Sequence, residues 1–465
     1  MAKLFFSFLG TSEYVRCNYG IDDRWHNNVQ FVQTATLHLT CADWERGDRV
    51  FIGCTKEAKN SNLQLLLAEL DASGWTLTPV PVDLPDATSE EDLWQIFEAL
   101  TDCVEDGDEL VFDITHSFRS LPMLFTVLIQ YLKMARNIRV RGVYYGAFER
   151  LGRPADVKEL AMASRNAPII DLTPFLSLYD WSAGIDHFLR FGSPTDLERL
   201  VNQHVAPILK RTAGRDADAQ ALRGLVKRIG EFARAAQYVR GHELTTMAFS
   251  SQIVAPLRRI SDGFLPPLEP ILKRLEDTFA AWPDHDPGNA MRTVRWCIDH
   301  DQVQQGITLL QETLVDQWVR RCADLLERPS IAATEPARWR RDFISSLFAV
   351  LGRGLLPEQW KSPLDAHLPV ARACAKCVPE ALAAEYDKLT KLRNDINHGG
   401  FSQPRKAKRL RDGLERGFEA IAELTPLDNG LAAADVRSIY LLNTPILTAY
   451  GDFRFSGPIE PEVAL

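Results

Sequence analysis

The chain has 465 residues, which is too long for one ordinary hydrophobic core, so we expect roughly two to four domains. Hydrophobic residues make up 46% of the sequence and charged residues 25%, as in soluble globular proteins, and no stretch approaches the ~18 uninterrupted apolar residues of a membrane span. The formal net charge of −9 argues against a protein coated in nucleic acid, although it leaves room for a local basic groove.

Residues 1–172 alternate short apolar runs with helix-like segments. The runs predict strands at residues 3–9, 49–54, 77–81, 109–113, 139–145 and 168–171, and the segments between them predict helices at residues 29–40, 61–72, 89–104 and 120–135. Ser89 and Asp92 have the spacing of a capping box, which supports the third helix. This alternation predicts an α/β fold with a mostly parallel, doubly wound sheet.

Two of the predicted strands end in small, polar residues. These residues are Gly10, Thr11, Ser12, Thr115, His116, Ser117, Arg119 and Ser120. In open α/β sheets ligands bind at the carboxyl ends of strands, where the strand order reverses. The backbone N–H groups at the start of the following helix favour an anion, and Arg119 adds a possible bidentate contact to a phosphate. The same residues also fit an ordinary turn, with Ser117 or Ser120 as the helix cap and Arg119 facing solvent.

Other features of this half narrow the choice of function. The pattern G-x-G-x-x-G does not follow the first strand, and G-x-x-x-x-G-K-[ST] does not occur, so a dinucleotide dehydrogenase or a P-loop NTPase is disfavoured. The first ten residues predict a core strand rather than a signal peptide. The eight cysteines are scattered, as expected for reduced thiols in a cytoplasm. The segment around Asp22, Asp23, Trp25 and His26 fits either a lid or, preferably, a solvated loop.

From residue 173 onward the strand pattern gives way to helical spacing. Helices are predicted at residues 175–191, 196–210, 219–239, 267–282, 302–326, 338–351, 370–384 and 406–424. We therefore expect an all-α region, divided into a segment 173–300 and a segment 301–428. Cys374 and Cys377 form a lone C-x-x-C, which is not expected to bind zinc and would pack within a helix. No metal site with credible ligand spacing occurs in the sequence.

Arg393, Asn394 and His398 form the second polar motif, at the end of a predicted helix. Five residues advance about 500° around a helix, or about 140° beyond one full turn, so the Arg and His do not share a face. Gly399 and Gly400 predict a helix stop, however, and a His in a fraying last turn can swing toward its Arg. The pair suits RNA cleavage without a metal, in which His moves protons and Arg stabilises charge on phosphoryl oxygens. Asn394 would hold the phosphate or orient His398.

The spacing of this pair is weak evidence on its own. R-x-x-x-x-H also occurs at 199–204 and 295–300, and Arg and His in a last turn can simply complement the helix dipole. Only the third copy has an Asn after the Arg, a Gly-Gly stop and a basic segment behind it. That segment contains Arg405, Lys406, Lys408, Arg409 and Arg411.

Both motifs resemble those of one known group of proteins. FDITHSFRSLP resembles the D-x-T-H-G-F-R-S-L-P signature of CRISPR-associated proteins that carry a CARF sensor domain, and SFLGTSEY with the downstream FVQ resembles their opening. RNDINH resembles the R-N-x-x-x-H motif of HEPN ribonucleases. A CARF-like half followed by such a helical half is similar to the ancillary ribonucleases of type III CRISPR systems. The resemblance covers most of residues 1–425 and is specific at the two motifs.

The resemblance implies a cytoplasmic homodimer, or a higher even oligomer, with a Rossmann-like CARF sensor at 1–172, a helical connector at 173–300 and a HEPN domain at 301–428. The paired sensors would bind a cyclic oligoadenylate through the polar residues of the two strand ends. Binding would activate a composite site that cuts single-stranded RNA to a 2′,3′-cyclic phosphate and a 5′-hydroxyl, without metal or cofactor. Arg393 and His398 would be catalytic, with Asn394 assisting. Ser117 stands where the family usually has Gly, which affects the expected ring size or affinity.

The tail, residues 436–465, returns to a strand pattern. SIYLLNTPILTAYGDFRF resembles the opening of the small ring nucleases first known as viral anti-CRISPR proteins, so the tail is interpreted as the truncated start of such a domain. That interpretation makes cyclic tetra-adenylate the expected activator. The alternative is a hairpin that closes the helical domain.

Two other functions are compatible with the sequence. One is a non-catalytic, ligand-responsive regulator that binds DNA or a protein partner, for which residues 196–245 offer a weak helix-turn-helix candidate. The other is a nucleotide-modifying enzyme acting at residues 115–120.

Overall fold

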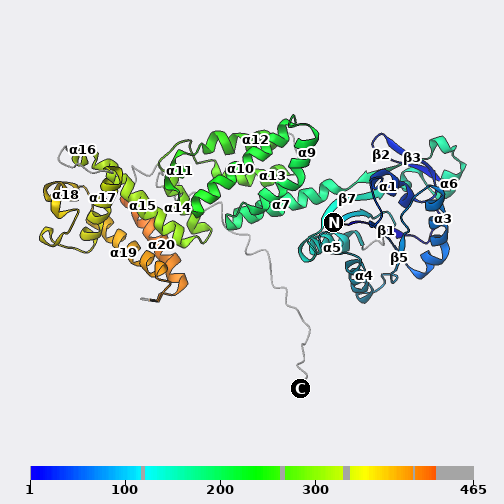
Figure 1. Ribbon diagram of the computed structural model, residues 1–465, viewed down its shortest axis with the longest axis horizontal. Helices are drawn as coiled ribbons and strands as arrows, with labels where there is room; N and C mark the ends of the chain where they lie inside the picture. Colours follow the sequence, from blue (N-terminus) through cyan, green and yellow to red (C-terminus); the bar gives the residue numbers. More distant parts are fainter. Residues whose placement is uncertain (1, 117–120, 262–267, 328–335, 402–403, 426–465) are drawn as a thin grey trace, which may run out of the picture. The chain divides into compact units, whose positions relative to one another are not determined.

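The computed structural model describes residues 2–116, 121–261, 268–327, 336–401 and 404–425. The chain divides into two compact units between Tyr179 and Asp180 (Figure 1). The predicted separation of the helical region at residue 300 stays a prediction, and the predicted tail domain at 436–465 lies outside the described residues. Among the described residues, no helix combines the length and the apolar character that a membrane crossing requires.

The first unit contains an eight-stranded sheet with the order β3-β2-β8-β7-β6-β1-β4-β5. The strands are β1 (Lys3–Leu9), β2 (Cys17–Ile21), β3 (Arg24–Val29), β4 (Arg49–Cys54), β5 (Val80–Asp83), β6 (Glu109–Asp113), β7 (Arg139–Gly146) and β8 (Asn166–Asp171). The five strands from β5 to β7 are parallel. β8 runs antiparallel to β7, and β2 pairs parallel to β8 and antiparallel to β3. The predicted α/β unit with a mostly parallel sheet is therefore confirmed.

β1 lies where the strand order reverses. The chain passes from β1 to β4 and β5 on one side, and then returns to β6 and β7 on the other side. The carboxyl ends of β1 and β6 consequently lie next to each other at the switch point, which is where open α/β sheets bind ligands.

Helices cover both faces of this sheet (Figure 1). The helical segments of the unit are α1 (Val32–Thr40), α2 (Lys56–Ala58), the π-helical η1 (Lys59–Leu63), α3 (Gln64–Ala72), α4 (Glu90–Asp102), α5 (Leu121–Ala135), the 3-10 turns η2 (Phe148–Leu151) and η3 (Met162–Ser164), and α6 (Pro154–Glu159). Alternate residues of β1 pack on opposite faces, as the two-residue period of a strand requires. Leu4, Phe6 and Phe8 join the core under α4 and α5, and Phe5 and Leu9 join the core under α1 and α3.

The structure corrects three predictions for this unit. The segment that contains Trp25 and His26 is neither a lid nor a loop, because it forms the β2–β3 hairpin. Every residue of β2 is buried, so its sequence, CNYGI, lacks the alternation that marks a half-exposed strand. The strand predicted at 77–81 lies at Val80–Asp83, and the first helix begins at Val32 rather than at residue 29.

The second unit is helical, as predicted, and its described residues contain no strand. Its helices, with α7 leading into them, are α7 (Thr173–Phe191), α8 (Thr195–Leu200), the π-helical η4 (Val201–Val205), α9 (Ala206–Arg211), α10 (Ala217–Gln237), α11 (Gly241–Thr246), the π-helical η5 (Ser250–Val254), α12 (Ala255–Ser261), α13 (Glu269–Phe279), α14 (Asn289–Asp299), α15 (Val303–Arg321), α16 (Ala323–Leu326), α17 (Pro336–Gly352), the 3-10 turns η7 (Pro357–Gln359) and η8 (Asp365–His367), α18 (Leu368–Ala375), α19 (Glu380–Asn397) and α20 (Ala407–Leu424). The helix predicted at 370–384 is split, because Pro379 caps the start of α19.

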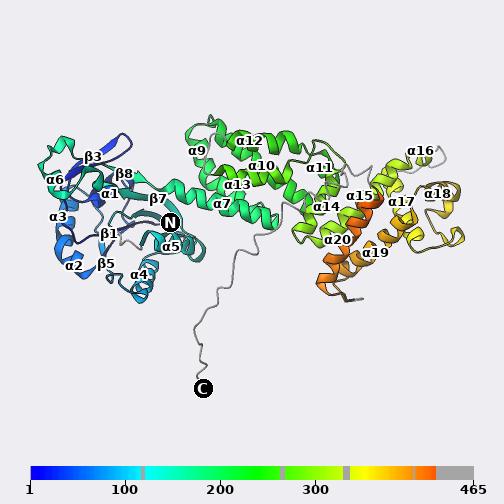
Figure 2. The same ribbon diagram turned by 180° about the vertical axis from the view of Figure 1, so that it is seen from behind.

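α15 is the central helix of the later part of this unit (Figure 2). It packs against α14, α17, α19 and α20. Leu310, Leu314 and Trp318 of α15 are fully buried, which ties these helices together through apolar contacts. The C-terminal end of α19, where the second polar motif lies, is thus supported by a packed bundle.

The start of α4 offers a test of the local sequence signals. Ser89 Oγ accepts a hydrogen bond from Asp92 N at 3.1 Å, and Asp92 Oδ2 accepts one from Ser89 N at 3.1 Å, as the capping box predicts. We expect Ser89→Ala to lower the local stability of α4 by about 1 kcal/mol. Amide hydrogen exchange of α4 measures this change. Thr78→Ala, at an exposed position before β5, serves as the control, and equal exchange in the two variants would contradict the capping role.

Candidate functional site

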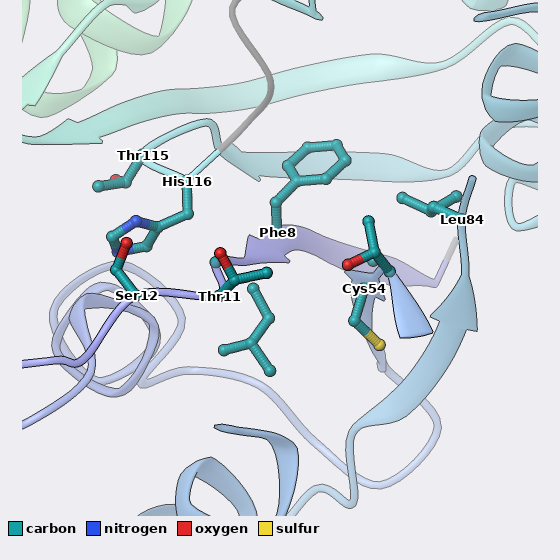
Figure 3. A pocket seen from close by; sticks show the side chains of 11 residues that line it. Phe8, Thr11, Ser12, Cys54, Leu84, Thr115 and His116 are labelled. Carbon is teal, nitrogen blue, oxygen red and sulfur yellow. The ribbon is translucent and has the colours of Figure 1, made fainter. Parts of the chain in front are cut away.

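A cavity of about 300 Å³ opens at the carboxyl ends of β1, β4 and β6 (Figure 3). Its lining residues are Phe8, Leu9, Gly10, Thr11, Ser12, Gly53, Cys54, Thr55, Leu84, Thr115 and His116. The structure therefore brings together five of the eight residues predicted to bind a ligand. The other three, Ser117, Arg119 and Ser120, lie outside the described residues.

The first wall of the cavity is the loop after β1. Gly10 N donates a hydrogen bond to Tyr14 Oη at 2.7 Å, and Asn62 Nδ2 donates to the carbonyl oxygens of Gly10 at 2.9 Å and Ser12 at 3.1 Å. A Cβ atom at Gly10 would lie 3.2 Å from Tyr14 Oη, which explains the glycine at this close approach. The loop backbone is thus fixed by its neighbours. The hydroxyl groups of Thr11 and Ser12 have no hydrogen-bond partner among the described residues and are available to a ligand.

The second wall follows β6 and is built on a buried carboxylate. Asp113 accepts hydrogen bonds from Ser7 Oγ at 2.9 Å, from Thr115 N at 3.0 Å and from the Thr115 hydroxyl. Complete burial raises the pKa of Asp113, and these hydrogen bonds oppose the rise. Thr115 Oγ1 also accepts a hydrogen bond from Gly146 N at 2.8 Å. Because its hydroxyl proton and one lone pair are already used, Thr115 mainly shapes the wall, although it was predicted to contact ligand.

His116 closes the cavity beside Tyr14. The two rings pack edge to face with their centroids 4.6 Å apart, and His116 Nε2 is enclosed without a hydrogen-bond partner among the described residues. Burial of the ring lowers the pKa of His116 to about 4. The imidazole is therefore neutral at pH 7 and offers one donor and one acceptor rather than a positive charge.

The carboxyl end of β4 also lines the cavity, and this was not predicted from the sequence. Cys54 and Thr55 line the cavity, and Thr55 Oγ1 accepts a hydrogen bond from Ala58 N at 3.3 Å, which caps α2. β4 pairs directly with β1 in the sheet. The rule that identified the two polar strand ends would have added this third one, had the neighbours of β1 been known from the sequence.

Arg393, Asn394 and His398 lie at the C-terminal end of α19. The helix ends at Asn397, and the next two glycines take left-handed conformations, with φ of 61° at Gly399 and 73° at Gly400. The predicted stop is confirmed. His398 N still donates to the carbonyl of Asn394 at 3.0 Å, so His398 caps the last turn.

The side chains of this motif are unengaged. Asn394 and His398 are exposed and Arg393 is half-buried, and none of the three makes a side-chain hydrogen bond or ion pair with another described residue. A histidine and a guanidinium in this condition can both contact a substrate.

The Arg and His side chains of the two other R-x-x-x-x-H pairs form ion pairs or hydrogen bonds within the protein. Their contacts are Arg199–Asp196 at 3.1 Å, His204–Asp180 at 3.9 Å, Arg295–Asp299 at 2.6 Å and His300 Nδ1 to the Trp296 carbonyl at 2.7 Å. The contacts of the side chains therefore distinguish the third copy of the motif from the other two, which the spacing in the sequence could not do.

The basic segment covers the residues just before α20 and the first turn of that helix. Lys406, Lys408 and Arg409 are exposed and have no ion-pair partner among the described residues. Arg411 pairs with Asp301 at 3.2 Å, and Arg405 lies 3.7 Å from the buried Asp395. Three free cations therefore follow the motif closely in the chain, as a phosphate-contacting surface requires.

Groups of three or more His, Cys, Asp or Glu residues arranged to hold a metal ion do not occur in the described part of the chain. Cys374 is buried at the end of α18, but Cys377 is exposed beyond it, so the predicted packing of both within one helix is wrong for Cys377.

Comparison with known proteins gives one informative match. No protein-family model matches the chain. The sequence is similar to CRISPR-associated protein MJ1674 from Methanocaldococcus jannaschii, with 24% identity over 248 residues. The match covers 52% of this chain, and it spans only about a third (34%) of the length of that protein.

The low pKa of His116 predicts a pH dependence of stability. The unfolded chain binds a proton at the ordinary histidine pKa of about 6.5, whereas the folded protein resists it until about pH 4. The stability from neutral His116 is thus present above pH 6.5 and is lost as the pH falls toward 4, at up to about 1.4 kcal/mol per pH unit.

We expect His116→Asn to remove this loss. Hydrogen exchange of the β1 amides from pH 7 to pH 4.5, compared between the unmodified protein and His116→Asn, measures how the stability of each protein depends on pH. A difference in protection that stays constant with pH would show that His116 titrates normally.

Proposed function

We propose that the protein is a ligand-gated endoribonuclease of CRISPR antiviral defence. A cyclic oligoadenylate, in the first instance cyclic tetra-adenylate, binds the cavity of the α/β unit and activates cleavage of single-stranded RNA at Arg393 and His398. The observation that carries this proposal is the contrast between the unengaged Arg393–His398 pair and the two occupied pairs of equal spacing. The similarity to a CRISPR-associated protein and the cavity at the strand switch point support the remaining parts.

The cavity suits a nucleotide-like ligand. The hydroxyl groups of Thr11 and Ser12 and the neutral imidazole of His116 supply hydrogen bonds to ribose hydroxyls, phosphodiester oxygens or a base edge. A volume of about 300 Å³ is at the lower limit of small-molecule sites, so a single cavity holds one part of a nucleotide ring. The whole ring then requires the cavities of two copies, which is the reason for proposing a homodimer.

At the other site the chain supplies acid–base and electrostatic catalysis. His398 takes the proton of the 2′-hydroxyl as that oxygen attacks the adjacent phosphorus, and a histidine returns a proton to the departing 5′-oxygen. Arg393 stabilises the negative charge that builds on the phosphoryl oxygens, and Asn394 orients the phosphate. The products are a 2′,3′-cyclic phosphate and a 5′-hydroxyl. If ligand binding shifts the protein toward this state, RNA binding must strengthen ligand binding by the same factor.

Replacing His398 tests the catalytic assignment. We expect His398→Ala to lower RNA cleavage in the presence of cyclic tetra-adenylate by roughly 10²- to 10⁴-fold, the usual effect of losing a general acid–base group. A fluorogenic single-stranded RNA measures the rate. His204→Ala is the matched control, because His204 has the same spacing from an Arg but is paired with Asp180. Loss of cleavage in both variants, or in neither, would contradict the assignment.

Replacing Thr11 tests the sensor. Thr11→Val keeps the shape of the side chain and removes its hydroxyl group, so we expect weaker ligand binding with an unchanged maximal rate. The concentration of cyclic tetra-adenylate that gives half-maximal cleavage should rise by about tenfold, which corresponds to the loss of one hydrogen bond. Thr78→Val, outside the cavity, should leave this concentration unchanged. An unaltered activation curve for Thr11→Val would remove Thr11 from the ligand site.

A further inference from the structure

The helical unit contains a second cavity, of about 330 Å³, that the proposed function does not use. It lies where the C-terminal ends of α7 and α10 meet the starts of α8 and α15 (α7, α10 and α15 are labelled in Figure 2). Its lining residues are Phe191, Gly192, Ser193, Pro194, Thr195, Glu198, Ala233, Arg234, Gln237, Tyr238 and Gln302. A volume in this range can hold one flat, ring-shaped group.

The side chains of this cavity combine aromatic surface with neutral hydrogen-bonding groups. Phe191 is 55% exposed and Tyr238 is 58% exposed, so both present open ring surface. The Gln237 amide, the Tyr238 hydroxyl and Gln302 Nε2 have no hydrogen-bond partner among the described residues. Aromatic faces stack on bases, and amides pair with base edges, which is how proteins bind unpaired RNA.

The charge of the cavity favours a base over a phosphate. Arg234 is the only cation of the lining, and its Nη1 lies 2.7 Å from Glu198 Oε1 in an ion pair. The pair cancels the charge of the guanidinium. A group bound here is therefore recognised through stacking and neutral hydrogen bonds.

Gly192 keeps the wall of the cavity open. It has a φ of +68°, and a Cβ atom built on it would lie 3.2 Å from both Gln302 Nε2 and Trp296 Nε1. Trp296 Nε1 is buried and has no hydrogen-bond partner in the described part of the chain. Two N–H donors thus converge on the glycine, and any larger residue there would displace them.

This cavity is connected to the catalytic motif through the first turn of α15. Gln302 caps α15 and lines the cavity, while Gln304, two residues later, donates from Nε2 to Asn397 Oδ1 at 3.5 Å. Asn397 immediately precedes His398. Asp301, on the other side of Gln302, pairs with Arg411 of α20 at 3.2 Å. The residue before His398 and a residue that lines the cavity are thus linked through the first turn of α15.

We propose that this cavity is a base-binding subsite for the RNA substrate. It receives one unpaired nucleobase next to the scissile bond, stacked on Tyr238 or Phe191 and hydrogen-bonded by Gln237 and Gln302, and so gives cleavage a base preference. The proposal rests on the ribonuclease function proposed above.

The test uses the full-length protein, cyclic tetra-adenylate and a panel of single-stranded RNAs that differ in one base at each position around the cleaved bond. We expect one position to show a base preference. In Gln302→Ala the ratio of kcat/KM between the best and the worst base at that position should fall by roughly tenfold, the size of one lost hydrogen bond. In Tyr238→Ala kcat/KM should fall by roughly tenfold for every base, the size of one lost base-stacking contact. Gln252→Ala, an exposed glutamine on η5, should keep the ratio of the unmodified protein.

A binding measurement keeps the two proposals separable. Fluorescence anisotropy with short homopolymers of A, C, G and U reports base preference without requiring cleavage. An unchanged base ratio in Gln302→Ala together with an unchanged kcat/KM in Tyr238→Ala would overturn the subsite and leave the ribonuclease intact. Absence of cleavage by the unmodified protein would overturn the ribonuclease, and the subsite would then stand or fall on whether Tyr238→Ala and Gln302→Ala weaken homopolymer binding relative to Gln252→Ala.

Discussion

The burial of β1 on both faces is the constraint from which the rest of the α/β unit follows. A strand with Leu4 and Phe6 on one side and Phe5 and Leu9 on the other needs a helical layer on each face, and its backbone needs a neighbouring strand at each edge. The chain meets the second requirement by crossing back from β5 to β6. That crossing makes the strand order reverse beside β1, and the cavity is the geometric result of the reversal. At the carboxyl ends of β1 and β6 the Ser7–Asp113–Thr115 network adds side-chain hydrogen bonds to the backbone pairing of the two strands.

The helical unit also depends on one buried element, which is the helix α15 rather than a strand. α15 is buried along most of its length and packs mainly against α14, α17, α19 and α20, so its two ends contact different helices of the unit. Near its start, a cluster of aromatic rings that includes Phe232, Phe279 and Trp296 fills the space between α10, α13 and α14, with centroids 5.2 to 6.0 Å apart. Two of these contacts are edge to face and the third is stacked, and rings packed in this way resist rearrangement, which gives the neighbouring cavity fixed walls.

Much of the fold could be predicted from the sequence because the central strands are continuous apolar runs, and such runs carry a strong signal. The β2–β3 hairpin could not, since β2 is buried throughout and mixes polar with apolar residues, while β3 is mostly exposed and polar. The same distinction applies to the candidate site. The rule that ligands bind at the carboxyl ends of strands identified the loops after β1 and β6. It could not reveal that the Thr115 hydroxyl group is hydrogen-bonded to Asp113 and Gly146.

Properties that depend on contacts between residues far apart in the sequence could not be predicted either. His116 is neutral because it is enclosed, and enclosure depends on Tyr14, which belongs to another loop. The three Arg–His pairs became distinguishable only when the partners of two of them were placed. The cavity of the helical unit draws on residues from 191 to 302, in segments that no linear pattern joins.

The two consecutive left-handed glycines that follow α19 have a consequence for the direction in which His398 points. Each further residue of an α-helix turns the chain by about 100°, so a helix one residue longer would send His398 and everything after it in a new direction. Residues other than glycine seldom adopt the left-handed backbone conformation at two consecutive positions. Gly399 and Gly400 therefore fix the point at which α19 ends, and insertions or deletions upstream in the helix would rotate His398 relative to the rest of the bundle without moving that end point along the sequence.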